Sequence, residues 1–235
     1  MSEIFMKLRI KEMMQGKIKK YLLFGFVEIF LVVAGILIAL SINNWNNRRT
    51  QRNDELKIYQ SISRRIQEDN LVILDDVEYN NIYLEQMRFA DRIISEDDRT
   101  RLDTLLHIIP NLFRYSDSDK SSNIYQNLVN SGELKILANS EITSGLQELE
   151  QTYIYMTRME NIHRQLILDI IGRDIIKNMD LTKVTASQPE VFYSFQFHNL
   201  IFLAIRIMEE KNDIYQNALL QIDAINALIK KDITK

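Results

Sequence analysis

YLLFGFVEIFLVVAGILIALSI, residues 21–42, is an almost uninterrupted apolar run. As an α-helix rising about 1.5 Å per residue it would be roughly 33 Å long, which matches one crossing of a bilayer. The run is longer than the apolar region of a cleaved signal peptide, about 7–15 residues, although Ala39-Leu40-Ser41 is a candidate cleavage site for that alternative. We therefore predict one transmembrane helix over residues 21–42 that is retained as an anchor.

Both ends of the run carry the residue types of a membrane–water interface. The candidate anchors are Lys19, Lys20, Tyr21, Trp45, Arg48 and Arg49. The basic leader, residues 1–20, holds six Lys or Arg against four in the comparable stretch after the run, which favours a cytoplasmic N-terminus. We expect a single-pass protein of a bacterial inner membrane with a periplasmic C-terminal domain, and the absence of cysteine is compatible with that compartment.

Glu28 is the only ionisable residue between Phe24 and Leu40. At about 100° per residue a small and polar face gathers within about 80°: Gly25, Glu28, Val32, Gly35 and Ala39. Bulky side chains gather opposite: Phe26, Phe30, Val33 and Leu37. Gly35 and Ala39 would let another helix approach closely, and the Glu28 carboxyl could hydrogen-bond across the contact. The alternative is that Glu28, about 10 Å inside the run, is reached by water and has no partner.

The run and its flanks also carry a family signature. Glu28-Ile29, then GILIAL at residues 35–40, then NNWN at residues 43–46, follow a Lys-rich leader. This order resembles an uncharacterised bacterial family of single-pass membrane proteins, domain of unknown function 6090, most strongly over residues 17–49. IYQNLVNSGELKIL, residues 124–137, is similar to the family more loosely. The resemblance implies architecture and location and supplies no catalytic residue.

The remainder of the chain predicts an all-α domain, with a stalk and first bundle helix at 43–98 and the rest of the bundle at 99–235. Apolar residues recur at helical spacing from Tyr59 to Ile94, from Ile142 to Ile170 and from Leu200 to Ile229. Such helices must bury their stripes against each other, so we expect an antiparallel bundle without strands. Ser140 is the expected N-cap of the second long helix, and the last is expected from about Phe192 to Lys230.

Local patterns that could carry chemistry are weak. Glu160 and His163 have the Glu-x-x-His spacing of di-metal bundles, but no second such pair exists, so we interpret them as a polar layer. The loop at 117–123 starts like a calcium loop but has Ser122 and Leu128 where glycine and glutamate are required. The sequence contains no cysteine nucleophile, Gly-x-Ser-x-Gly motif or phosphate-binding glycine loop. We expect no enzyme, cofactor or metal site.

Two functions remain open. In the first, the small and polar face binds a second copy or another membrane protein, and the helical domain is an interaction module. In the alternative, the domain senses a small ligand, for which the aromatic stretch Phe192 to Phe202 is the candidate pocket, and signals through a partner. A filled aromatic core with apolar side chains exposed elsewhere would favour the first. The acidic balance of the chain, with a formal net charge of −3, gives no basic patch for nucleic acid.

Overall fold

The computed structural model describes residues 2–116 and 123–234. For residues 2–22, 24, 170, 171 and 174 it describes the backbone only. The chain divides into two compact units, Met1–Asp54 and Glu55–Lys235. Its elements in order are α1 (Ser2–Ser95), η1 (Arg99–Arg101), α2 (Leu102–Ile108), η2 (Ile109–Phe113), α3 (Ile124–Ser131), η3 (Glu133–Ile136), α4 (Ser140–Leu166), the π-helical turn η4 (Ile167–Ile171), α5 (Gly172–Asn178), β1 (Met179–Asp180), β2 (Thr185–Ala186), η5 (Pro189–Tyr193) and α6 (Phe195–Ile233). The predicted all-α class is confirmed.

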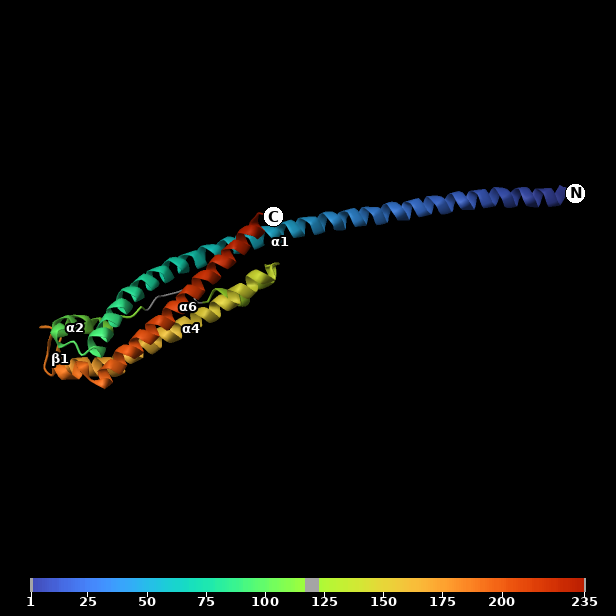
Figure 1. Ribbon diagram of the computed structural model, residues 1–235. Helices are drawn as coiled ribbons and strands as arrows, with labels where there is room; N and C mark the ends of the chain where they lie inside the picture. Colours follow the sequence, from blue (N-terminus) through green and yellow to red (C-terminus); the bar gives the residue numbers. More distant parts are fainter. Residues whose placement is uncertain (1, 117–122, 235) are drawn as a thin grey trace. The chain divides into compact units, whose positions relative to one another are not determined.

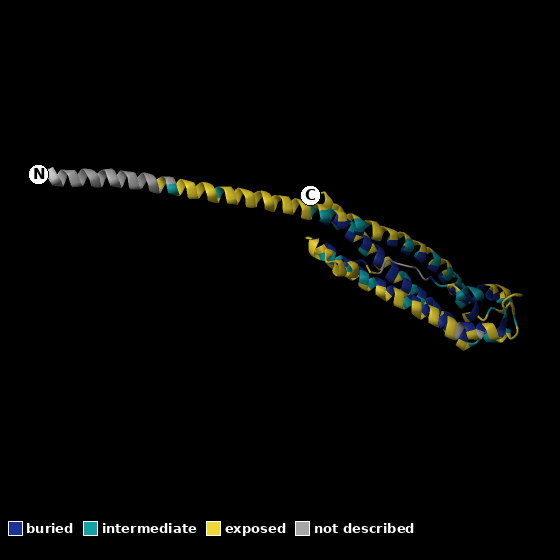
Figure 2. Cartoon of the chain, turned by 180° about the vertical axis from the view of Figure 1, so that it is seen from behind, coloured by how far each residue is buried: buried dark blue, intermediate teal, exposed yellow. Residues whose placement is uncertain are grey.

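The described part of the N-terminal unit, residues 2–54, consists of the first part of α1. The helix continues without a break through the Asn-rich residues 43–47, so the low helix propensity of asparagine does not end it here. By length and composition α1 contains a stretch that could cross a membrane. The apolar side chains described between residues 23 and 42 are almost all exposed (Figure 2). An apolar surface of this extent needs a lipid or protein environment to remove it from water.

The C-terminal unit is a bundle of three long helices, residues 55–95 of α1, α4 and α6 (Figure 1). Tyr153 on α4 donates a hydrogen bond to Asp69 on α1, and the backbone N–H of Ala138, just before α4, donates to Glu55. The two residues are 84 positions apart in the first pair and 83 in the second. Because this separation stays almost constant from one end of the helices to the other, α1 and α4 run in the same direction. The described parts of the connection between them, residues 96–116 and 123–139, therefore lead from the end of α1 back to the start of α4 at the other end of the bundle.

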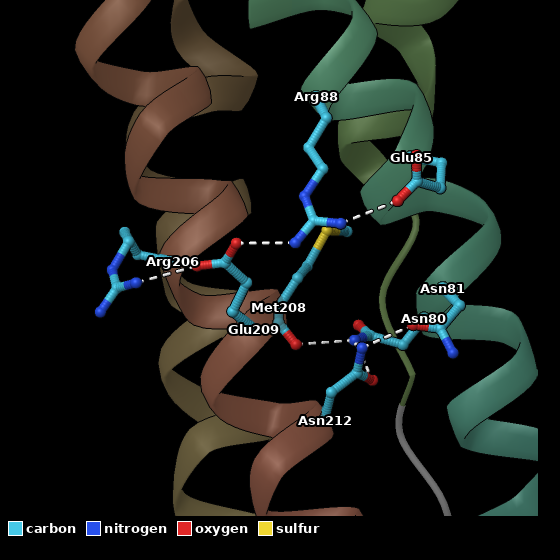
Figure 3. A network of polar contacts seen from close by, with 8 residues as sticks. All are labelled: Asn80, Asn81, Glu85, Arg88, Arg206, Met208, Glu209 and Asn212. Atoms are coloured by element: carbon cyan, nitrogen blue, oxygen red, sulfur yellow. Dashed lines mark hydrogen bonds and ion pairs between the residues drawn. The ribbon is translucent and has the colours of Figure 1, made fainter.

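The third helix, α6, runs antiparallel to the other two, as the bundle prediction requires. Its register against α1 is set by polar contacts that Figure 3 shows. Buried Asn80 donates to the Met208 carbonyl and to Asn212, each at 2.8 Å. At the edge, Arg88 bonds Glu209 at 2.9 Å. A one-residue slip of α6 would lose both contacts and leave the Asn80 amide buried without its acceptors, which costs about 1–3 kcal/mol.

The helix ends follow local capping chemistry, with small shifts from the prediction. The N-cap of α4 is Asn139, whose side chain accepts from the Glu141 N–H at 2.9 Å, and the prediction of Ser140 is wrong by one residue. Ser194 caps α6, so this helix begins at Phe195 after the 3₁₀ turn η5. Gly132 ends α3 in the left-handed conformation with φ of 76°, as expected of a helix-ending glycine.

The expectation of no strand is wrong in one place. β1 and β2 pair antiparallel, with Met179 opposite Ala186 and Asp180 opposite Thr185. Between them the Asp180 carboxylate accepts from the backbone N–H groups of Thr182 and Lys183, which closes the turn. Two residues a strand are too short to show the alternation from which a strand is recognised.

The buried side chains of the bundle form two apolar clusters. One contains the end of α1 from Leu84, together with α2, η2 and the start of α6. The other contains α1 from Ile58 to Ile73, the start of α4 and the end of α6. The predicted stripes are buried, except that Val77 and Ile207 are half-buried and Ile170 lies outside the described side chains. On each long helix a polar stretch separates the two clusters.

Candidate functional site

The predicted association face lies in the N-terminal unit. Glu28, Val32, Gly35 and Ala39 are exposed on α1, and Gly25 is half-buried. A Cβ added to Gly25 or Gly35 would meet no described atom within 4 Å. The Ser41 hydroxyl, near the end of the run, donates to the Leu37 carbonyl at 2.8 Å and so is satisfied without a partner. Among the described side chains between residues 23 and 42, Glu28 is therefore the polar group for which an apolar environment has the greatest cost.

The predicted interface anchors are only partly described. Trp45 is exposed, and the guanidinium carbon of Arg49 lies 5.8 Å from the centre of its ring, one helical turn away. This cation–π pair combines an aromatic ring and a positive charge, the two features of an interfacial anchor. Arg48 is exposed beside it. The side chains of Lys19, Lys20 and Tyr21 lie outside the described residues.

A second candidate lies inside the C-terminal unit. We call it the polar centre, and it consists of buried side chains from α1, the segment after η2, α4 and α6: Asp76, Ser116, Glu160, His163, Lys211 and Tyr215. Glu160 and His163 are almost completely buried, which confirms their interpretation as a polar layer within the α4 stripe. Lys211 has no exposed surface at all.

Hydrogen bonds connect the polar centre in a chain. Lys211 Nζ donates to the Ser116 carbonyl at 3.2 Å and to its hydroxyl at 2.5 Å. Ser116 Oγ lies 2.8 Å from the Tyr215 hydroxyl, which donates to Glu160 Oε1 at 3.1 Å. Because the single Tyr215 proton goes to Glu160, Ser116 must donate to Tyr215. The chain therefore has one direction, from the Lys211 ammonium to the Glu160 carboxyl.

The electrostatics of the polar centre follow from burial. Burial, and then the positive charge of Lys211, lower the pKa of His163 from 6.5 to about 3. His163 is therefore neutral at pH 7, and its Nδ1 has no hydrogen-bond partner among the described residues. Burial and the Glu160 carboxyl raise the pKa of Tyr215, so its hydroxyl remains a donor. The arrangement holds a lysine and two acids inside the bundle and fixes how α4 and α6 meet.

The comparisons place the chain in a family. The model described as Family of unknown function (DUF6090) matches residues 28–203. The chain belongs to this family. The family match begins at Glu28, inside the apolar run, and extends through α4 into the first part of α6, so it covers much of both units. The resemblance predicted from the leader, the apolar run and NNWN is thus confirmed. No curated protein and no solved structure matches this DUF6090 chain.

The histidines and the loop with calcium-like spacing do not come together into a site among the described residues. Among the residues that the structure describes, no three His, Asp or Glu side chains are placed to hold a metal ion. His198 bonds Asp91 at 2.9 Å at the side of the bundle, and exposed His107 lies against the Asp103 carbonyl. Of the loop with calcium-like spacing, residues 117–122 lie outside the described residues, and Leu128 is part of an apolar cluster.

Two of the four phenylalanines in the aromatic stretch Phe192 to Phe202 belong to the apolar core. Phe192 and Phe197 are buried and meet edge to face, with ring centres 5.1 Å apart. Phe195 and Phe202 are exposed, so the four phenylalanines of this stretch do not converge. Two surface pockets of the bundle, one between α1 and α3 and one between α4 and α6, contain no residue of this stretch.

Sequence reasoning missed most of the polar centre. The available signal was Lys211, which lies three residues after Met208 and four before Tyr215, in the middle of the apolar stripe of α6. A lysine at that position is either buried together with polar partners or marks the point where the buried face of the helix ends. Asp76 and Ser116 gave no comparable signal, because their burial depends on helices distant in sequence.

Proposed function

We propose that the protein is a membrane-anchored interaction module that associates through the small and polar face of its transmembrane helix, Gly25, Glu28, Val32, Gly35 and Ala39. The partner is a second copy or another membrane protein. We further propose a bacterial inner-membrane location with a cytoplasmic N-terminus and a periplasmic bundle. The proposal assigns no catalytic role to any residue.

The observation that carries the proposal is the open space at Gly35. A Cβ at this position would touch no described atom of the chain, so the close approach that glycine permits is unused within it. Small residues one turn apart, as Gly35 and Ala39 are, allow the backbones of two membrane helices to come into contact.

Glu28 supports the same face. Its side chain is exposed on a helix surrounded by exposed apolar residues, and a carboxylate at depth in lipid costs about 2.5–3.5 kcal/mol. A partner helix that supplies a hydrogen-bond donor would remove much of that cost. The same partner would cover Gly35, because the two residues lie two turns apart on one face.

The bundle offers a further argument for protein binding. Its aromatic stretch is filled at Phe192 and Phe197, whereas three large apolar side chains are exposed on α1: Leu71, Leu74 and Ile82. At about 100° per residue these three lie within about 80° of one another, so they form one stripe on the outer surface of the helix. This pattern supports an interaction module more than a sensor built on the aromatic stretch.

The proposal is tested by photo-crosslinking in native membranes from Val32, with Val33 as the matched control. The two positions are adjacent valines on opposite faces of the helix, so insertion and expression should be equal. We expect specific adducts from Val32 and few from Val33, and mass spectrometry identifies whether the partner is another copy. Equal labelling from both positions would rule out a specific face.

Two substitutions test what the face contributes. Glu28→Leu and Gly35→Leu should each reduce the Val32 adduct several-fold, the first by removing the carboxyl and the second by blocking close approach. Val33→Leu on the opposite face should leave it unchanged. Protease added to intact spheroplasts should digest the bundle, and full protection would contradict the proposed topology.

A further inference from the structure

A pocket lies between α1 and α3, away from both candidates described above. Its volume is about 330 Å³, at the small end of the range for ligand sites. One wall is α1 from Lys57 to Arg65, and the other is α3 with the turn that follows it. Both walls belong to the C-terminal unit, and the polar centre contributes no residue to the pocket.

The floor of this pocket is apolar. Ile58 and Ile62 from α1 meet Ile124 and Leu128 from α3, and all four side chains are buried as part of one apolar cluster. Each pair is spaced by four residues, so each presents one ridge of its helix to the other. A compact aliphatic or aromatic group is what such a floor accommodates.

The rim is polar and mostly cationic on one side. Lys57, Ser61 and Arg65 follow each other at intervals of one helical turn along α1, so the backbone positions of the two cationic residues are about 12 Å apart with a serine between them. Across from them Asn127 and Ser131 add amide and hydroxyl groups from α3. Arg65 is exposed, so its guanidinium can turn towards a ligand.

The single acid on the rim limits the ligand. Glu133 follows α3, so the rim carries two cations and one anion and suits a ligand of one negative charge better than a polyanion. Arginine binds carboxylates through two parallel hydrogen bonds, so the guanidinium on the rim favours a ligand with a carboxylate group. The apolar floor favours a ligand whose remaining part is apolar.

We propose that the α1–α3 pocket binds a small monocarboxylic acid, whose apolar body lies on Ile58, Ile62, Ile124 and Leu128 and whose carboxylate is bound by Arg65. Such an acid could be a soluble aromatic acid or a short fatty acid released from lipid. The proposal goes beyond association of the membrane helix and does not depend on it.

The test measures binding of two probes, 4-phenylbutyrate and octanoate, to the full chain in lipid nanodiscs by ligand-observed NMR. Empty nanodiscs give the background, and 4-phenylbutanamide is the neutral control for the carboxylate. We expect saturable binding of at least one acid and at least tenfold weaker binding of the amide, since hydrogen bonds to charged groups are the stronger ones. Which acid binds more tightly distinguishes a soluble from a lipid-derived source.

Substitutions then locate the site. Arg65→Gln should weaken acid binding about tenfold, whereas Arg64→Gln, the neighbouring exposed arginine outside the pocket, should change it less than twofold. Asn127→Trp, at an exposed position on the rim, should fill the pocket and abolish binding without disturbing the bundle, which circular dichroism checks. The proposal is overturned if the folded wild-type chain binds neither acid saturably, or if Arg65→Gln and Arg64→Gln bind alike.

Discussion

Gly35 and Gly145 lie in similar helices with opposite surroundings. A Cβ at Gly145 in α4 would lie 3.1 Å from Cγ1 of Ile225 on α6, while a Cβ at Gly35 in α1 would touch no described atom. At Gly145 the absence of a side chain is used by the fold, because α6 packs against the space. At Gly35 the same absence is unused within the chain. The difference separates a glycine required for folding from one available to a partner.

Two glutamates repeat the contrast. Glu160 is buried in the polar centre and accepts a hydrogen bond from Tyr215, so the bundle itself satisfies its carboxyl. Glu28 is exposed on an apolar helix. The bundle therefore supplies a donor to the Glu160 carboxyl from another of its own helices, whereas under the proposed function Glu28 obtains its donor from a partner helix.

The largest effect in the bundle is expected from Lys211→Met. The substitution removes a completely buried cation from a centre that also holds Asp76 and Glu160, and breaking such a buried charged group typically costs about 3–5 kcal/mol. Denaturant unfolding of the full chain in nanodiscs, followed by circular dichroism, measures the loss. Lys230→Met, at an exposed lysine on the same helix, should change stability by less than about 0.5 kcal/mol. Equal effects would mean that the polar centre is not stabilising.

An acid-dependent loss of stability is expected from His163. Its pKa is about 3 in the folded chain against 6.5 for an unperturbed histidine, so unfolding takes up a proton between these values. Its contribution is complete above pH 6.5 and is lost as pH falls towards 3. Between pH 7 and pH 4 the wild type should lose about 3 kcal/mol more than His163→Met, which has no titrating ring. Parallel pH profiles for the two proteins would contradict the assignment of a buried neutral histidine.

The smallest change in stability is expected from substituting the two glycines, Gly145 and Gly35. These two variants should also differ most clearly in which property they change. Gly145→Leu should destabilise the bundle by roughly 1–3 kcal/mol, because the new side chain must displace Ile225. Gly35→Leu should leave bundle stability within about 0.5 kcal/mol of wild type and act on membrane association instead. Unfolding and crosslinking measured on both variants complete the test. If Gly35→Leu unfolded the bundle, the two glycines would not differ in the way the structure indicates.

Much of the architecture was accessible from sequence because its signals are local. Helical spacing from Tyr59 to Ile94 predicted the last part of α1, and Gly132, which ends α3, is of the residue type that most readily adopts the positive φ of a helix end. The N-cap of α4 was missed by one residue because Asn139 and Ser140 are both good caps, and only the backbone geometry decides between them. The strands β1 and β2 were missed because two residues are too few to show the alternation of apolar and polar side chains that predicts a strand.

The sequence by itself determined that the chain is helical, that residues 21–42 could cross a membrane and that Glu28 shares a face with Gly35 and Ala39, because each follows from composition and a 100° period along one helix. Only the tertiary structure decided that α1 and α4 run in the same direction, that Lys211 and Tyr215 meet Ser116 and Glu160, and that Lys57 and Arg65 border a pocket with α3. These features join residues far apart in sequence, and their energies depend on burial, which is a property of the packed bundle rather than of any one helix.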